Sequence, residues 1–174
     1  MNRALLKYGW IWLLFLPALV MGQAQELLSL RLVVPISTPD GQREISLEKY
    51  QSLHVIITNH SDVPQKLWKD WNTWGYFNLK LVWKLSNKTF SISRKAPQSW
   101  DGDFPDFWVL PPGESLVIEI DMASGEWDGF PDLYGEKYHA TLQAFYENKA
   151  DVLASEFGIW VGKIASQELE VVFQ

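Results

Sequence analysis

One stretch of the chain decides its fold class: Phe77-Asn78-Leu79-Lys80-Leu81-Val82-Trp83-Lys84-Leu85. Its odd-numbered positions are all apolar, whereas three of the four even-numbered positions are Asn or Lys. Successive side chains of a β-strand point to opposite faces of a sheet, so this alternation predicts a strand with one face in the core and the other in water. Trp83 falls on the apolar face, and we expect it in the core.

The same alternation recurs along the rest of the chain. The further apolar rows are Leu28, Leu30, Leu32 and Val34; Leu53, Val55 and Ile57; Leu116, Ile118, Ile120 and Met122; Tyr138, Ala140, Leu142, Ala144 and Tyr146; and Leu169, Val171 and Phe173. Shorter strands are predicted at 44–47, 90–94 and 159–164. Turn-forming sequences such as Thr38-Pro39-Asp40-Gly41 and Pro111-Pro112-Gly113 separate these runs.

Because no amphipathic helix is available to cover a sheet, the second layer should be another sheet. The sequence therefore predicts an all-β fold, an antiparallel immunoglobulin-like β-sandwich of about seven to nine strands.

The first 24 residues have the features of a secretory signal peptide. Arg3 and Lys7 precede an apolar run of about 14 residues, and the small residues Gly22 and Ala24 follow it. That run is short for a helix that must cross about 30 Å of hydrocarbon. We therefore expect a signal peptide over 1–24 and a secreted or periplasmic β-sandwich domain over 25–174 that does not insert into the membrane. An uncleaved membrane anchor is the alternative.

Composition narrows the classes of partner. Without Arg3 and Lys7, 13 basic residues stand against 21 acidic ones, a net charge of −8. This balance argues against nucleic acid and against anionic lipid surfaces, because both attract clusters of Lys and Arg. The chain has no Cys, so packing must stabilise it without disulfides. Aromatic residues are 14% of the chain, and each buried ring removes about 150–250 Å² from water.

Several segments resemble parts of a known group of proteins. They are Val55-Ile56-Ile57-Thr58-Asn59-His60-Ser61, Leu110-Pro111-Pro112-Gly113-Glu114-Ser115, Ala144-Phe145-Tyr146-Glu147 and Trp160-Val161-Gly162-Lys163-Ile164-Ala165-Ser166. Over residues 50–174 the chain is similar to bacterial immunoglobulin-like domains of the kind seen in the intracellular proteinase inhibitor family and related exported proteins. The resemblance implies the sandwich fold. No inhibitory residue is carried over, because the export signal and a Trp-rich insert depart from that family.

The Trp-rich insert is Leu67-Trp68-Lys69-Asp70-Trp71-Asn72-Thr73-Trp74-Gly75. Its three Trp residues recur every third position, so a single helical turn would place them on one side. Exposed Trp rings stack on sugars, which makes Trp68, Trp71 and Trp74 the first candidate ligand-binding residues for an extracellular glycan, with Asp70 and Asn72 as hydrogen-bonding partners. The next candidates are Trp100, Trp108 and Trp127. The competing interpretation is that these rings plug an open end of the sandwich.

Acidic residues suggest one candidate metal site. Asp101, Asp103 and Asp106 offer three carboxylates around Gly102, and Ca²⁺ prefers several oxygen ligands from a loop. No loop with the EF-hand pattern follows, and solvated Asp-Gly turns explain the same residues. Calcium is therefore the only cofactor that we consider. Zinc is disfavoured, because the chain lacks Cys and any closely spaced pair of His.

A near-repeat links two loops. The segment from Trp100 to Trp108 resembles the segment from Trp127 to Tyr134, and the strand predicted at 116–122 lies between them. If that strand is regular, its ends are about 25 Å apart. We therefore expect the two loops to lie far from one another.

The sequence contains few of the residues and motifs that catalytic sites use. The chain has three His residues, no Cys and no Gly-x-Ser-x-Gly motif.

Two acceptor patterns for N-glycosylation, at Asn59 and Asn87, matter only in a eukaryotic secretory pathway. Our main hypothesis is an exported, non-enzymatic domain that binds another macromolecule, a protein or a glycan, in the cell envelope or outside the cell. The alternatives are a carbohydrate-binding domain and, more remotely, a small hydrolase.

Overall fold

The protein is described by a computed structural model that covers residues 27–35, 39, 41–46, 52–86, 88–97, 99–100, 103–130 and 137–173. The predicted signal peptide over 1–24 lies outside the described residues. The elements are β1 (Leu28–Val33), β2 (Glu44–Ile45), β3 (Ser52–Asn59), β4 (Gln65–Trp68), β5 (Leu79–Leu85), β6 (Lys88–Arg94), β7 (Phe107–Leu110), β8 (Ser115–Asp121), β9 (Trp127–Asp128), β10 (Tyr138–Asn148), α1 (Val152–Phe157), β11 (Gly162–Ala165) and β12 (Leu169–Phe173).

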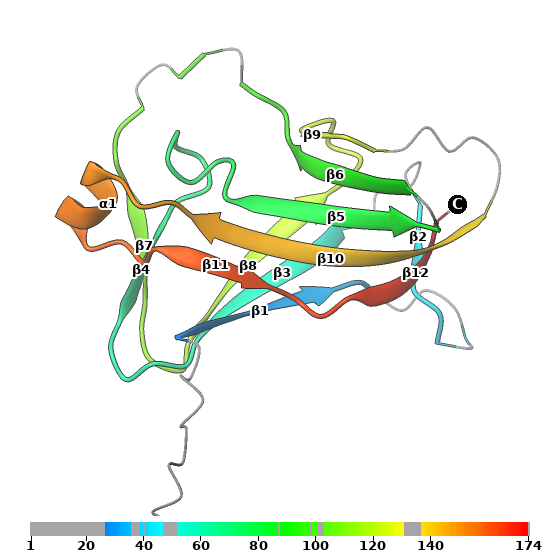
Figure 1. Cartoon of the computed structure of the whole chain (residues 1–174), viewed down its shortest axis with the longest axis horizontal. Helices are drawn as coiled ribbons and strands as arrows, with labels where there is room; N and C mark the ends of the chain where they lie inside the picture. The colour runs from blue at the N-terminus through cyan, green and yellow to red at the C-terminus, as the bar shows by residue number, and fades with distance from the viewer. Residues whose placement is uncertain are drawn as a thin grey trace, which may run out of the picture.

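The strands form two sheets and a two-stranded ribbon (Figure 1). The small sheet has the order β1-β3-β8, and the large sheet has the order β2-β12-β10-β5-β6-β9, with β11 also paired to β10. Strands β4 and β7 pair with each other and form the ribbon. The fold is all-β, as predicted. The described strand pairs are antiparallel, with one exception: β2 and β12 pair in parallel.

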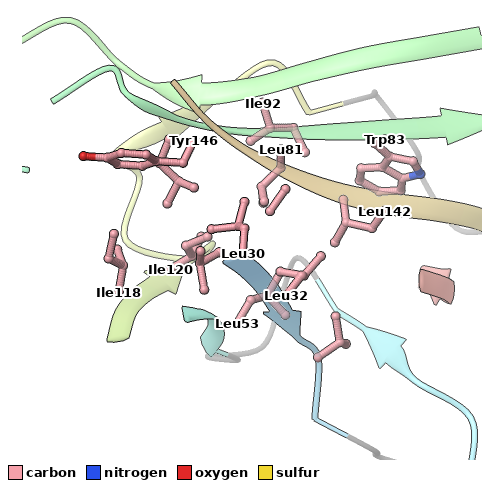
Figure 2. Packing of buried hydrophobic residues seen from close by; sticks show 14 of the residues in the cluster. Leu30, Leu32, Leu53, Leu81, Trp83, Ile92, Ile118, Ile120, Leu142 and Tyr146 are labelled. Carbon is pink, nitrogen blue, oxygen red and sulfur yellow. The ribbon is translucent and has the colours of Figure 1, made fainter. Parts of the chain in front are cut away.

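The core lies between the inner faces of the two sheets (Figure 2). Leu30 and Leu32 of β1 face Leu81 of β5 and Leu142 of β10 across it. Trp83 is fully buried and stacks on Phe173, so its predicted place in the core is confirmed. The alternation predicted for the long strands is also confirmed, and only positions near strand ends are half-buried. These positions are Leu85, Leu116, Tyr138 and Leu169.

Three described strands, β4, β7 and β9, have no counterpart among the predicted ones. They are two to four residues long, too short for alternation to distinguish them. Strand β5 also begins later than predicted, at Leu79, and Phe77 is exposed. The reason is local: the Asn78 N–H donates to the carbonyl of Gly75, so residues 75–78 form a turn that closes the Trp-rich insert.

The ribbon continues β3 and β8 around a corner (Figure 1). The corner consists of residues 59–64, which lead from β3 to β4, and residues 111–114, which lead from β7 to β8. Its second half is a tight turn in which the Glu114 N–H donates to the Pro111 carbonyl. Gly113 has a φ of 77°, a conformation that strongly favours glycine. The predicted Pro-Pro-Gly turn is therefore confirmed.

Asn59 holds the corner together. Its side chain is fully buried, and its amide group donates to the carbonyls of Val63 and Leu110, each at 2.9 Å. Its side-chain oxygen accepts from the Ser61 N–H at 2.9 Å and from the Ser61 hydroxyl at 2.7 Å. One amide thus ties both halves of the corner. Because the folded protein uses all of these groups, Asn59 is not accessible to glycosylation, and Asn87 lies outside the described residues.

Replacing Asn59 should therefore destabilise the protein strongly. Asn59→Asp keeps the side-chain volume but replaces the two donors with an acceptor that faces two carbonyls. We expect a loss of about 2–4 kcal/mol in the free energy of unfolding, measured by urea denaturation. Ser61→Ala is the matched control and should cost about 1 kcal/mol or less. Equal losses for the two variants would show that Asn59 does not hold the corner.

Candidate functional site

Exposed large aromatic side chains lie at the end of the molecule that carries the ribbon, and three of them form the candidate site. Trp71, Phe104 and Trp108 keep 45%, 57% and 41% of their surface in solvent. The Trp71 and Phe104 rings meet edge to face, with centroids 5.4 Å apart and planes at 72°. We call these three residues the aromatic cluster. Exposed rings are costly in water, so several of them side by side mark a candidate binding surface.

Lys69 lies between two rings of the aromatic cluster. Its Nζ is 4.6 Å from the Trp108 ring centroid and 5.8 Å from that of Trp71. The same Nζ donates to Asp106 Oδ2 at 2.7 Å. This hydrogen bond, helped by one from the Phe107 N–H, holds the pKa of Asp106 below its ordinary value of 3.8. The charged pair therefore fixes the spacing of the two indole rings.

Hydrogen bonds and a tight turn hold in place the insert that carries Trp71. Asn72 is fully buried, donates to the Asp106 carbonyl at 2.8 Å and accepts from the Gly75 N–H at 3.0 Å. A Cβ atom on Gly75 would collide with the Lys69 carbonyl oxygen, so the turn needs glycine at that position. The conformation of the insert is thus set by buried backbone contacts.

Arg94 of β6 binds the insert through an ion pair and hydrogen bonds to Asp70. Its guanidinium donates to the Asp70 carbonyl at 2.6 Å and to Asp70 Oδ2 at 2.8 Å. It also lies 5.1 Å from the Tyr76 ring centroid and 5.6 Å from that of Trp127. Tyr76 in turn meets Trp100 edge to face at 5.2 Å.

The two near-repeated segments consequently contribute to one cluster, because Trp100 and Trp127 both lie next to the Tyr76–Arg94 pair. The prediction that the loops lie far apart is wrong. The chain returns after β8 to pair β9 with the end of β6, and that pairing brings Trp127 opposite Arg94.

The structure separates the three Trp residues predicted to share one side of a helical turn. Trp68 is in β4, pairs with Phe107 and is almost fully buried. Trp74 packs on Trp68, with ring centroids 5.8 Å apart, and Trp71 alone points to solvent. Trp68 and Trp74 belong to a second apolar cluster, together with Ala154, Ile159, Phe107, Leu153 and Phe157. The predicted exposed row is therefore wrong for Trp68, because a strand replaces the helical turn there.

The polar residues predicted to hydrogen-bond a sugar have other partners. Asp70 is paired with Arg94, and the amide of Asn72 is used inside the insert. The Asn72 amide is thus unavailable to a ligand, and a ligand at Asp70 would share its carboxylate with Arg94. Sugar binding by this segment stays a prediction, with Trp71 as its exposed ring.

The candidate calcium ligands do not gather among the described residues. Asp101 lies outside them. Asp103 accepts from the Thr73 N–H and hydroxyl, while Asp106 faces Lys69. Within the described part of the chain, no group of three or more His, Cys, Asp or Glu side chains is placed to hold a metal ion.

A separate hollow of about 740 Å³ lies over the outer face of β5, β10 and β12. Lys84, His139 and Glu170 line it, together with the chain at 41–43. Lys84 is paired with Glu168, and His139 makes no hydrogen bond with a described side chain that could orient it as a base. The hydrolase alternative gains no support from this hollow.

Sequence reasoning missed Phe104, Lys69 and Arg94 as parts of the site. One signal could have pointed to it, namely the uncharged run Phe107-Trp108-Val109-Leu110 between Pro105 and Pro111. Lys69 and Arg94 gave no signal, because their importance depends on pairing with distant residues.

Comparisons with known proteins add little. No known family model matches the chain, and no curated protein matches it. Four chains of solved structures do match. One of them, from the structure described as "AvmM Catalyzes Macrocyclization in Alchivemycin A Biosynthesis", is 16% identical and has a TM-score of 0.35, with 84% of this chain and 87% of that chain covered. At that TM-score the likeness carries no argument about this chain.

No helix in the described part of the chain is long and apolar enough to cross a membrane.

The Lys69–Asp106 pair should give the aromatic cluster a pH dependence. Because the pKa of Asp106 is lowered, the pair persists above pH 3.8 and is lost as the pH falls below that value. We expect the indole N–H signals of Trp71 and Trp108 in ¹H–¹⁵N NMR spectra to shift with a midpoint below pH 3.8. In Asp106→Asn this step should be missing. A step that persists in the variant would contradict the role of the pair.

Proposed function

We propose that this protein is an exported, non-enzymatic interaction domain with an immunoglobulin-like β-sandwich fold, and that it binds another protein through its aromatic cluster. Export is supported by Arg3 and Lys7 before an apolar run, and by the small residues after it. The sandwich interpretation is supported by two mainly antiparallel sheets with a common core.

The exposure of Trp71, Phe104 and Trp108 together carries the proposal. Aromatic residues are enriched in protein interfaces, and Trp supplies much of the binding energy where it is buried on association. The cluster is also preorganised: Lys69 fixes two of its rings, and the Gly75 turn fixes the insert. A surface that is ordered before binding loses less conformational entropy when a partner arrives.

A protein partner fits the geometry better than a glycan. Stacking on a pyranose ring needs a flat aromatic face with polar groups beside it. Here Trp71 and Phe104 meet at 72°, and both Asp70 and Asn72 are already hydrogen-bonded. Angular aromatic surfaces suit the irregular shape of protein side chains.

Site-specific photo-cross-linking in the producing cells tests this function. A benzophenone amino acid would replace Phe104 in the full chain, and in a second experiment Trp71. We expect one predominant adduct with another protein at both positions, because both rings face solvent on the same surface. The adduct would be identified by mass spectrometry.

Val152 is the matched control, since it is 81% exposed at the start of α1 and outside the aromatic cluster. It should give no such adduct. The same adduct at Val152, or none at Phe104 and Trp71, would contradict the proposal. An adduct with glycan alone would favour the carbohydrate-binding alternative.

A further inference from the structure

Strand β7 has one edge without a partner strand. In the ribbon, the Lys69 N–H donates to the Asp106 carbonyl at 3.1 Å, which fixes the phase of the β4–β7 ladder. In an antiparallel ladder, residues alternate between pairs that exchange hydrogen bonds and pairs that point their N–H and C=O groups outward. Asp106 therefore belongs to a hydrogen-bonded pair, and such pairs recur at every second residue. Trp108 consequently hydrogen-bonds to β4, whereas the backbone groups of Phe107 and Val109 point away from β4.

An independent contact supports this assignment. Lys66 is the register partner of Val109, so its backbone should also point out of the ribbon, on the β4 side. Its carbonyl does so, because it accepts from the Trp160 N–H at 2.9 Å. The outer edge of β4 is thus partly covered, and that of β7 pairs with no described strand.

Most of the backbone N–H and C=O groups on the outer edge of β7 have no hydrogen-bond partner among the described residues. The Phe107 N–H donates to Asp106 Oδ1 at 2.8 Å. The N–H and C=O of Val109 and the C=O of Phe107 have no hydrogen-bond partner among the described residues. Because Val109 is 54% exposed, these groups are open to a strand that approaches from solvent.

The side chains on β7 also differ from those that usually protect a sheet edge. Exposed edges normally carry charges or proline, which discourage the addition of another strand. The free edge of β8 follows this rule, since Glu119 and Asp121 lie along it. The β7 sequence Phe107-Trp108-Val109-Leu110 itself carries no charge; Asp106, which covers the Phe107 N–H, and Pro111 limit the open edge to the residues between them.

We propose that an extended segment of the partner protein adds to β7 as a third strand of the ribbon. Its backbone pairs with Val109 and Phe107, and its side chains contact the neighbouring Trp108 and Phe104. Main-chain hydrogen bonds then provide affinity, and the aromatic rings provide selectivity for apolar side chains. This inference rests on the proposed function, whose binding surface it makes specific.

Charge favours a different, basic protein over a second copy of this chain. The chain has a net charge of −6, so two copies repel each other. Asp103, which precedes Phe104 of the aromatic cluster, bonds to Thr73 through its carboxylate and has no cationic partner among the described residues. The added segment should therefore alternate apolar with basic residues.

Val109→Pro tests this strand addition. It removes the outward N–H and leaves in place the backbone groups that bond to β4, so the β4–β7 ladder is kept, whereas the incoming strand loses its donor. The probe is a fluorescent synthetic peptide of alternating lysine and valine, and its affinity for the full chain is measured by fluorescence anisotropy. We expect Val109→Pro to weaken binding about tenfold or more.

Two variants serve as matched controls. Val109→Thr keeps the N–H and the β-branched shape, and it should bind like the wild type. Val117→Pro removes an outward N–H from the other free edge, that of β8, and should also leave binding unchanged. A peptide of alternating glutamate and valine should bind far more weakly than the lysine peptide.

A second readout needs no variant. Addition of the lysine peptide to the wild type should shift the backbone amide signal of Val109 more than that of Trp108. If the peptide fails to bind, or if Val109→Pro binds as tightly as the wild type and the Val109 amide does not shift, strand addition at β7 is overturned. Cross-linking at Phe104 would still stand in that case, so the failure of the inference differs from the failure of the proposed function.

Discussion

The hydrogen bonds of Asn59 are the constraint on which the rest of the arrangement depends. Strands β3 and β8 belong to the small sheet, and the same two chain segments continue beyond the corner as β4 and β7. A change of direction leaves backbone carbonyls without ladder partners, and burying such groups unpaired is costly. Asn59 satisfies the carbonyls of Val63 and Leu110 with a single amide. The corner can therefore be buried without a loss of hydrogen bonds.

The corner determines where the functional candidates lie. It directs the ribbon across one end of the molecule (Figure 1). There Trp68 belongs to the second apolar cluster, and Trp108 stays at the surface. The Trp-rich insert follows β4 directly, and its contacts to Asp106 tie it to the start of β7. The exposed aromatic rings and the open edge of β7 are thus two consequences of one turn in the backbone. A binding surface of this kind needs no deep cavity.

Much of the fold could be predicted from the sequence, because burial on one face imposes a period of two on each long strand. The rows that include Leu30, Val55 and Leu142 followed that rule. The ribbon could not be predicted, since four residues carry too little periodicity and Asn59 resembles an ordinary turn residue. The site was predicted in part. Trp71 was identified, but the regular spacing of Trp68, Trp71 and Trp74 suggested a helical turn, whereas pairing with Phe107 makes Trp68 part of a strand. Tertiary pairing overrode the local pattern there, and the same holds for Lys69 and Arg94, whose partners are distant in sequence.

The central claim is that the corner presents a strand whose outer edge is open to solvent. Amide hydrogen exchange in the free protein, resolved by residue, tests it most directly. The account predicts that the Val109 N–H exchanges quickly, because nothing described accepts its hydrogen bond, whereas the Trp108 N–H one residue earlier is protected by the ladder with β4. Slow exchange at Val109, equal to that at Trp108, would show that the edge is already covered and would contradict the account.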